Sequence, residues 1–172
     1  MRKSLLLIGT ALFAVALMSS SAMAAVNVKS LPTATFSGAS VNLTGGNFSG
    51  LGSVPAVATL TATGTVSYDC ANPQGHLSPG QNPVPAQPGT TEQGLGNADH
   101  NGRGTVSGIT ASVTAPSPAP TAQQVGCGGG GSNNWTVVLN TLTATSAQFT
   151  ITQNGQIVFC RNYTSSGTGT AC

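Results

Sequence analysis

Charged side chains are scarce in this sequence, at 5% of its 172 residues. No Asp, Glu, Lys, Arg or His occurs between Arg103 and Arg161, and none occurs between Lys29 and Asp69. Such stretches must cover the surface with hydroxyls, amides and backbone groups. Without a basic face the chain offers little to phosphate backbones or anionic lipid headgroups, so we expect no nucleic-acid partner.

The formal net charge of +2 comes from the first 24 residues. Arg2 and Lys3 precede a short apolar run, and the letters AMA at residues 22–24 fit the cleavage rule for secretory signals. We predict that residues 1–24 are a cleaved bacterial signal peptide and that the mature chain has no membrane span. That mature chain is neutral, with three basic and three acidic residues: Lys29, Arg103, Arg161, Asp69, Glu92 and Asp99.

The sequence lacks a CxxC pair, which argues against a zinc site or a thioredoxin-like redox site. Its four cysteines are Cys70, Cys127, Cys160 and Cys172. An even number in an exported chain predicts two disulfides and a secreted or extracellular location, or the periplasm if the host has an outer membrane. Parity alone leaves three connectivities open.

No stretch of the mature chain shows the 3.6-residue period of an amphipathic helix, whereas residues 59–70 alternate with a period of two. This period predicts a half-buried strand, because successive side chains of a strand point to opposite faces. The side chains expected to point inward are Leu60, Ala62, Val66, Tyr68 and Cys70. Threonines dominate the other face, and their β-branched side chains favour a strand.

Residues 105–114 carry a second strand signal, with Ile109 and Val113 on one face. Val106 is out of phase with them. A β-bulge at Gly108 would return Val106 to the buried face.

The letters NG at residues 154–155 predict a two-residue β-hairpin within residues 149–160, because this dipeptide favours the type I′ turn. The expected cross-strand pairs are Gln153 with Gln156, Ile151 with Val158, and Phe149 with Cys160. Ile157 and Phe159 would then lie on the opposite face. We expect the tail from Asn162 to Cys172 to cover them, and we expect self-association where it does not.

Six to eight strands with glycine- and proline-rich connections predict an all-β fold, an immunoglobulin-like antiparallel β-sandwich. About 148 mature residues suit one domain, so residues 25–172 are predicted to form a single sandwich. Residues 71–103 read as a long loop, which we expect a disulfide to anchor at its base.

The segments LTATGTVSYDCANPQGH, from residue 60, and VGCGGGGSNNWTVVLNTLTATSAQFTITQNG, from residue 125, together resemble a group of small secreted bacterial proteins of unknown function. In that group an alternating strand ending in cysteine precedes a second cysteine, a glycine-bearing loop and a closing hairpin. The likeness covers about half of the mature chain. It implies that Cys70 pairs with Cys127 and brings no catalytic residues; parity then leaves Cys160 to pair with Cys172.

Residues 97–102, N-A-D-H-N-G, match positions 1, 3, 5 and 6 of a calcium-binding loop. The match ends there, because position 12 would be Gly108 instead of a bidentate glutamate. The candidate ligands are Glu92, Asn97, Asp99 and Asn101, with Glu92 contributing from outside the loop. A polar turn is the reading we favour, and we expect no metal or cofactor.

Most ionisable groups of the mature chain lie between His76 and Arg103. No G-x-S-x-G or HExxH motif accompanies them, and no pair of carboxylates is flanked by aromatic residues. We therefore predict that the protein is not an enzyme and has no catalytic residues. Trp135, the only tryptophan, is in phase with Val137 and Leu139, which predicts a core position instead of a platform for sugar stacking.

These features predict a secreted structural or adhesive protein of the bacterial cell surface, whose partner is a neutral cell-wall polymer or another copy of itself. The alternative is a carbohydrate- or ligand-binding module that uses residues 71–103. A hydrolase ranks third.

Overall fold

The computed structural model describes residues 26–52, 54–95, 102–128 and 134–172, and the predicted signal peptide lies outside these ranges. The described residues form antiparallel strands and no α-helix, which confirms the all-β prediction. The strands are β1 (Asn27–Ser30), β2 (Thr33–Ser37), β3 (Ser40–Thr44), β4 (Gly46–Ser49), β5 (Ala56–Ala71), β6 (Leu77–Pro79), β7 (Val84–Pro85), β8 (Gly89–Gly94), β9 (Gly104–Val106), β10 (Ile109–Ser112), β11 (Thr136–Gln153), β12 (Gln156–Tyr163) and β13 (Thr170–Ala171).

The number of strands corrects the prediction, because the described residues form thirteen strands instead of six to eight. Several of them have only two to four residues. Such short strands carry too few residues to display an alternating pattern, so they cannot be recognised from the sequence.

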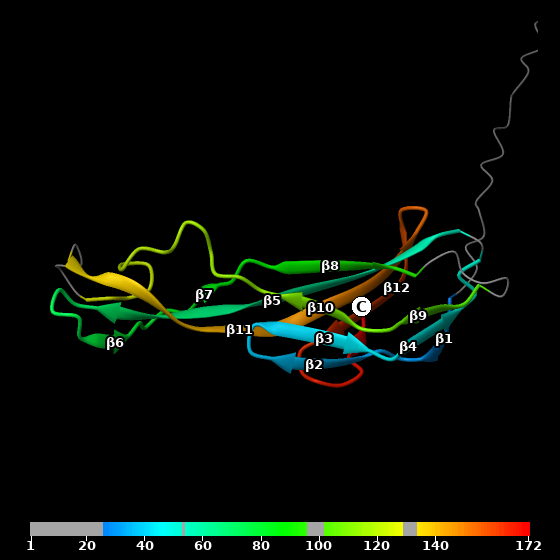
Figure 1. Ribbon diagram of the computed structural model, residues 1–172, viewed down its shortest axis with the longest axis horizontal. Helices are drawn as coiled ribbons and strands as arrows, with labels where there is room; N and C mark the ends of the chain where they lie inside the picture. Colours follow the sequence, from blue (N-terminus) through cyan, green and yellow to red (C-terminus); the bar gives the residue numbers. More distant parts are fainter. Residues whose placement is uncertain (1–25, 53, 96–101, 129–133) are drawn as a thin grey trace, which may run out of the picture.

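The long strands β5 and β11 form the centre of the structure. They pair antiparallel along their whole length, from Ala71 opposite Thr136 to Ala56 opposite Gln153. The sheet continues through β12 and β13 beyond β11, and through β6, β7 and β8 on the other side of β5. Figure 1 shows that these two strands run nearly from one end of the elongated molecule to the other.

The described part of residues 71–103 forms three short strands where the sequence predicted a long loop. Their strands β6, β7 and β8 pair in turn with the end, the middle and the start of β5. Residues 77–94 therefore run back along β5 and form the next layer of strands on that side of the sheet. Its prolines and glycines conceal this role, because they interrupt the alternation that identifies longer strands.

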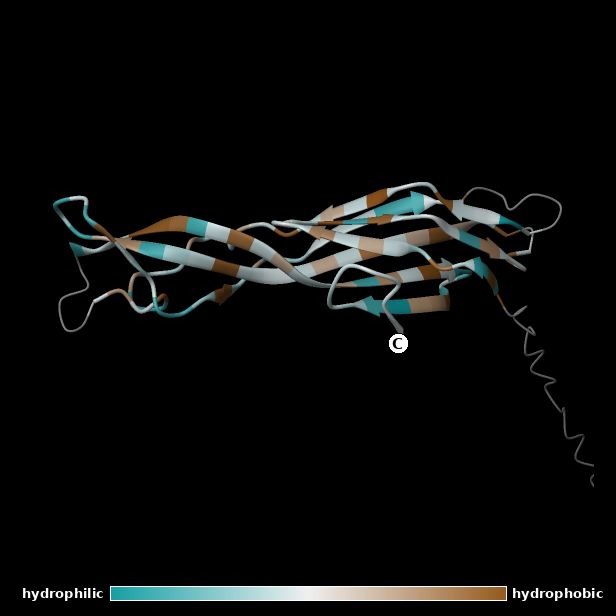
Figure 2. Cartoon of the chain, turned by 90° about the horizontal axis from the view of Figure 1, so that it is seen from below, coloured by the Kyte–Doolittle hydropathy of each residue, from teal (hydrophilic) through white to brown (hydrophobic). Residues whose placement is uncertain are grey.

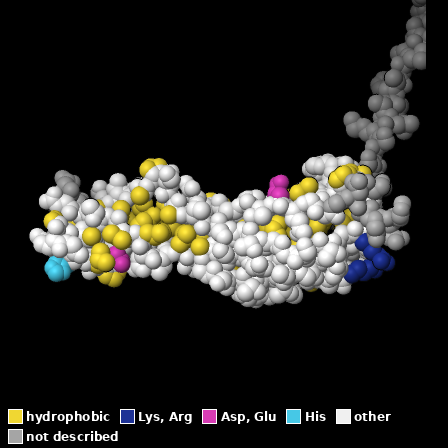
Figure 3. All heavy atoms as spheres, viewed as in Figure 1, with side chains coloured by type: hydrophobic (Ala, Val, Ile, Leu, Met, Phe, Trp, Pro, Cys, Tyr) yellow, Lys and Arg dark blue, Asp and Glu magenta, His cyan; other side chains and the backbone are white. Residues whose placement is uncertain are grey.

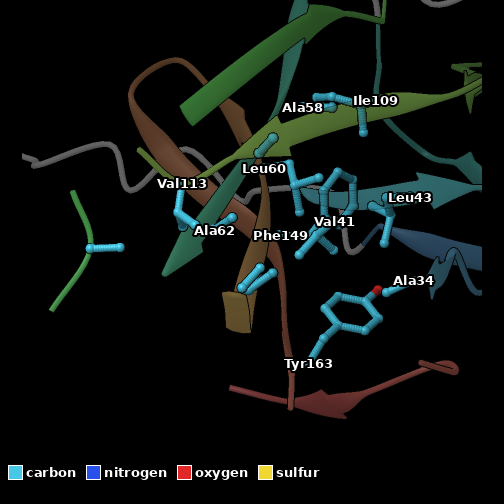
Figure 4. Close-up of a cluster of buried hydrophobic side chains, with 14 of the residues drawn as sticks. Ala34, Val41, Leu43, Ala58, Leu60, Ala62, Ile109, Val113, Phe149 and Tyr163 are labelled. Carbon is cyan, nitrogen blue, oxygen red and sulfur yellow. The ribbon is translucent and has the colours of Figure 1, made fainter. Parts of the chain in front are cut away.

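Two three-stranded sheets, β1-β4-β9 and β10-β3-β2, cover one face of the large sheet, as in a β-sandwich. Figure 4 shows Val41 and Leu43 of β3 gathered with Leu60 of β5 and Phe149 of β11. All four side chains are fully buried. The immunoglobulin-like connectivity stays a prediction.

The alternation of β5 confirms which of its faces is buried. Leu60, Ala62, Val66, Tyr68 and Cys70 are all buried, while the threonines between them are half-buried or exposed. The chain also turns at Gly108, whose φ is 141°. This turn ends β9 and begins β10, and it leaves both Val106 and Ile109 buried, as the expected bulge would.

The hairpin turn is confirmed, but the expected register beyond it is wrong. Gln153 lies opposite Gln156, with Asn154 and Gly155 at positive φ. A bulge at Val158 then places Phe159 opposite Ile151 and Cys160 opposite Thr150. Phe159 therefore joins the buried face, where its ring centroid lies 4.9 Å from that of Phe48. Ile157 remains 62% exposed.

The half of the molecule that the two smaller sheets leave uncovered is called the arm here. It contains the paired segments 65–71 of β5 and 136–143 of β11, together with β6, β7 and residues 113–128. Figure 2 shows its backbone as a narrow ribbon of two long strands twisting about one another. The arm can therefore expose more of its apolar side chains than the sandwich does.

Both expected disulfides are present. Cys70 in the arm pairs with Cys127, and Cys160 pairs with Cys172, with Cα–Cα separations of 5.5 Å in each case. Two disulfides indicate that the chain matures in an oxidising compartment.

Within the described residues, no helix has the length and apolar character that crossing a membrane requires.

Candidate functional site

Among the residues considered for calcium, the structure places only Glu92. Its side chain is exposed on β8, opposite Thr59 of β5. Asn97, Asp99 and Asn101 lie outside the described residues, so the calcium loop stays a prediction. The described residues contain no group of three or more His, Cys, Asp or Glu side chains that could hold a metal ion.

His76 and Glu92 are close in sequence but far apart in the fold. His76 lies in a turn beside Ala71, where its backbone N–H donates a hydrogen bond to the side-chain oxygen of Asn72. Glu92 lies beside Thr59, about 40 Å away along β5 at 3.3 Å per residue. Figure 3 likewise shows histidine at one end of the molecule and lysine and arginine at the other. No shared acid–base site can form between these two residues.

One face of the large sheet points away from the two smaller sheets. Most side chains on this face carry hydroxyl or amide groups. We call this set of side chains the hydroxyl face; each is half-buried or exposed. Its members are Thr59, Thr61, Thr63, Thr65 and Ser67 on β5, Thr141, Thr143, Ser146, Gln148 and Thr150 on β11, Thr90 on β8 and Asn162 on β12. The face is uncharged between Glu92 near one end and Asp69 near the other.

Hydrogen bonds across the strands hold these side chains in place. The hydroxyl oxygens of Thr63 and Ser146 lie 2.6 Å apart. The amide of Gln148 donates to Oδ1 of Asn162 over 3.1 Å. Similar hydroxyl pairs join Ser67 to Thr141 and Thr61 to Thr90. A hydroxyl has one donor and two acceptor lone pairs. Each hydrogen-bonded pair of hydroxyls can therefore form further hydrogen bonds to a ligand.

A shallow groove of about 520 Å³ crosses the hydroxyl face where β5, β11 and β12 lie side by side. Thr61, Thr63, Ser146, Gln148 and Asn162 are among its lining residues. These side chains combine donors and acceptors without any charge. The groove therefore has the chemistry to hydrogen-bond a neutral, hydroxyl-rich ligand, and nothing in its lining would select an ion.

A second, apolar pocket of about 450 Å³ lies in the arm. Val84 and Pro85 line one part of it, and Pro116, Pro118, Ala119 and Pro120 line another. Gln124 also lines it, and its Oε1 already accepts a hydrogen bond of 2.7 Å from the backbone N–H of Thr121. Figure 3 shows apolar side chains gathered on the surface of the same half of the molecule.

Trp135 is half-buried beside Gly128 and packs against the buried cluster, so its predicted core position is confirmed in part. Val137 is half-buried and Leu139 is 50% exposed. The alternation therefore places these three residues on a face that is only partly buried. The smaller sheets do not reach this part of β11. The alternation continues here, but Leu139 stays half exposed on the outer strand while Tyr68, opposite it on β5, is buried.

Sequence reasoning missed both the groove and the pocket. The threonines of the hydroxyl face were visible as one side of a strand, but their partners on β11 are some 80 positions away. The closely spaced prolines at 116, 118 and 120 indicated only the end of a strand. That spacing, combined with the prolines of residues 71–103, is the signal that could have suggested an apolar surface.

No protein-family model, curated protein or solved structure matches this chain.

Proposed function

We propose that the chain is a secreted structural or adhesive protein of the bacterial cell surface, with no catalytic activity, and that its hydroxyl face binds a neutral polymer. The observation that carries this proposal is the uncharged field of hydroxyls and amides along β5 and β11, with the groove at Thr63 and Ser146. Neutral polysaccharides present the same groups, so donors and acceptors on the two surfaces can pair.

The length of the face supports an extended ligand. The paired strands hold the hydroxyls in a rigid array, so little conformational entropy is lost when a polymer binds. A polymer that contacts many such groups gains affinity from many weak bonds. The scarcity of charge also predicts that this binding is insensitive to salt.

The test is co-sedimentation of the mature protein with purified cell wall and with insoluble neutral polysaccharides. Thr63→Val together with Ser146→Ala removes one hydroxyl pair while preserving the strand shape, and should weaken binding. Thr44→Val changes an exposed threonine on β3 and serves as the control. A wild-type protein that stays in the supernatant with every polymer, or that is released by salt, contradicts the proposal.

A second candidate function is the binding of a small apolar ligand in the proline-lined pocket, which uses Val84 and Pro85 from residues 71–103. Ala119→Arg would fill this pocket from an exposed position without disturbing the core. Ligand-detected NMR with apolar fragments should show binding to the wild type and none to this variant. Equal binding to both proteins would contradict the assignment.

A further inference from the structure

One border of the large sheet is open along the arm. β12 pairs with β11 only between Ala147 and Gln153. From Thr136 to Thr143 no described residue pairs with the same side of β11, and the contact resumes only where the N–H of Ala144 donates to the carbonyl of Gly38. The backbone donors and acceptors that point outward from this stretch therefore have no strand partner in the described part of the chain.

The residues of this stretch, which we call the open edge, favour pairing with another strand. The sequence from Thr136 to Thr143 is TVVLNTLT, which has high β propensity and contains no charge, proline or glycine. Exposed edges are normally protected by charged residues or proline. Leu139 is 50% exposed on one face of the sheet and Val138 is 42% exposed on the other. A neighbouring strand would shield both.

The other borders of the sheet are better protected. β13 pairs with the far side of β12 at Arg161 and Asn162, next to the Cys160–Cys172 disulfide. The far side of β5 is occupied by β6, β7 and β8 in succession. The open edge is the part of this sheet where a second strand fits with least obstruction.

We propose that the partner of the open edge is a second copy of this chain, paired antiparallel with it about a two-fold axis perpendicular to the sheet. The edge strand itself carries no charge, and the Asp69 carboxylate beside it on β5 accepts a hydrogen bond from the side chain of Asn140, so a second copy meets little repulsion and a charged peptide finds little attraction. Rotation about this axis joins the two sheets into one, so that each face of one molecule continues into the same face of its partner. Leu139 then lies near the apolar side chains of the partner on one face, and Val138 on the other.

The geometry limits the assembly to two copies. Pairing through a single self-complementary edge uses that edge in both molecules, so the contact is closed. The β-bulge at Asn140 interrupts the edge and disfavours the flat, repeating pairing of a fibril. Because both hydroxyl faces then lie on the same side of one continuous sheet, the dimer would present a polymer with twice the surface. The dimer itself does not depend on polymer binding.

The test measures the molar mass of the disulfide-intact mature protein by light scattering across a concentration series. The wild type should approach twice the monomer mass as concentration rises. Val138→Lys with Leu139→Lys places like charges against one another in the paired edge and should weaken association by roughly tenfold or more. Ile157→Lys, at the most exposed large apolar residue away from this edge, is the matched control and should still dimerise.

Amide hydrogen exchange of the wild type is a second measurement that does not depend on whether the variants fold. Residues 136–143 of the wild type should become more protected as concentration rises, while residues 156–158 should not change. A protein that stays monomeric, with unchanged exchange in the open edge, overturns the proposal. So does protection that appears only on adding an unrelated extended peptide, an equal loss of association in the Ile157→Lys control, or growth into fibrils.

Discussion

The hydroxyl of Tyr163 donates a hydrogen bond to the carbonyl oxygen of Pro32, over 3.2 Å. The contact joins β12 to the segment before β2 and spans most of the mature chain. Tyr163 is fully buried, and its burial raises the pKa of its hydroxyl from 10.0 to about 12, partly offset by the positive charge of Arg161.

The first prediction concerns alkaline unfolding. The fold favours the neutral form of Tyr163, so this stabilisation is complete below pH 10 and is lost as the pH rises towards 12. The free energy of unfolding should fall by on the order of 1–2 kcal/mol over this range. Denaturant titrations at each pH measure it. Tyr163→Phe should begin less stable and show a smaller fall; an equal fall in both proteins would refute the assignment.

The second prediction concerns the C-terminal segment. Truncation after Arg161 deletes Tyr163 and β13, and it leaves Cys160 without its partner. The edge of β12 is then open, so the truncated protein should aggregate and bind thioflavin T. Cys160→Ser with Cys172→Ser removes only the disulfide and should aggregate less. A truncated protein that stays monomeric and dye-negative at high concentration would show that this segment does not protect the edge.

The third prediction concerns the disulfide of the arm. Cys70 and Cys127 are separated by 57 residues, and closing a loop of that length stabilises a fold by about 4 kcal/mol in the chain-entropy model. Replacing both with serine should lower the unfolding free energy by a similar amount. The shorter loop between Cys160 and Cys172 predicts a smaller loss, of about 3 kcal/mol. Urea titration compares the two variants, and a larger loss in the second would contradict the ranking.

The fourth prediction concerns Gly64 of β5, which lies opposite Ala144 of β11. A Cβ atom at this position would collide with the backbone carbonyl oxygen of Thr143. Gly64→Ala should therefore destabilise the fold by about 2 kcal/mol or more, because a backbone atom cannot turn aside as a side chain can. Gly94→Ala, where a Cβ meets nothing within 4 Å, is the matched control. Equal thermal stability of the two variants would disprove the close approach.

The fifth prediction concerns the buried hydroxyl of Tyr68, which has no hydrogen-bond partner among the described residues. Desolvating a hydroxyl without a partner costs free energy. Tyr68→Phe should therefore leave stability unchanged or raise it by up to about 1 kcal/mol. Thermal unfolding measures the change. A clear loss of stability would reveal that the hydroxyl binds a group such as an ordered water.

Patterns within one strand were predictable, because they depend only on neighbouring residues. The alternation from Leu60 to Cys70 identified the buried face of β5, since side chains of a strand alternate wherever it packs. Asn154 and Gly155 identified the turn, because positive φ at both positions is a local requirement. The likeness around Cys70 implied its pairing with Cys127, and parity then assigned the other disulfide.

Features that depend on distant residues were not predictable in the same way. The bulge at Val158 turns Phe159 towards Phe48 and Phe149. The residues near the turn do not by themselves indicate that these three rings pack together. The pairing of β6, β7 and β8 with β5 was equally hidden, because the prolines of this segment suggested a loop. The groove at Thr63 and Ser146 exists only because two long strands lie side by side.

Composition and local pattern were enough to predict an all-β chain with one buried face on β5, a hairpin turn at residues 154–155 and a surface almost free of charge. Each of these follows from composition or from short-range periodicity, which tertiary contacts do not change. Long-range packing, by contrast, aligned the hydroxyls of β5 and β11 on one face and left the outer side of the start of β11 without a described strand partner. Strand neighbours and strand edges are relations between segments far apart in the chain, and packing across the whole sheet sets them.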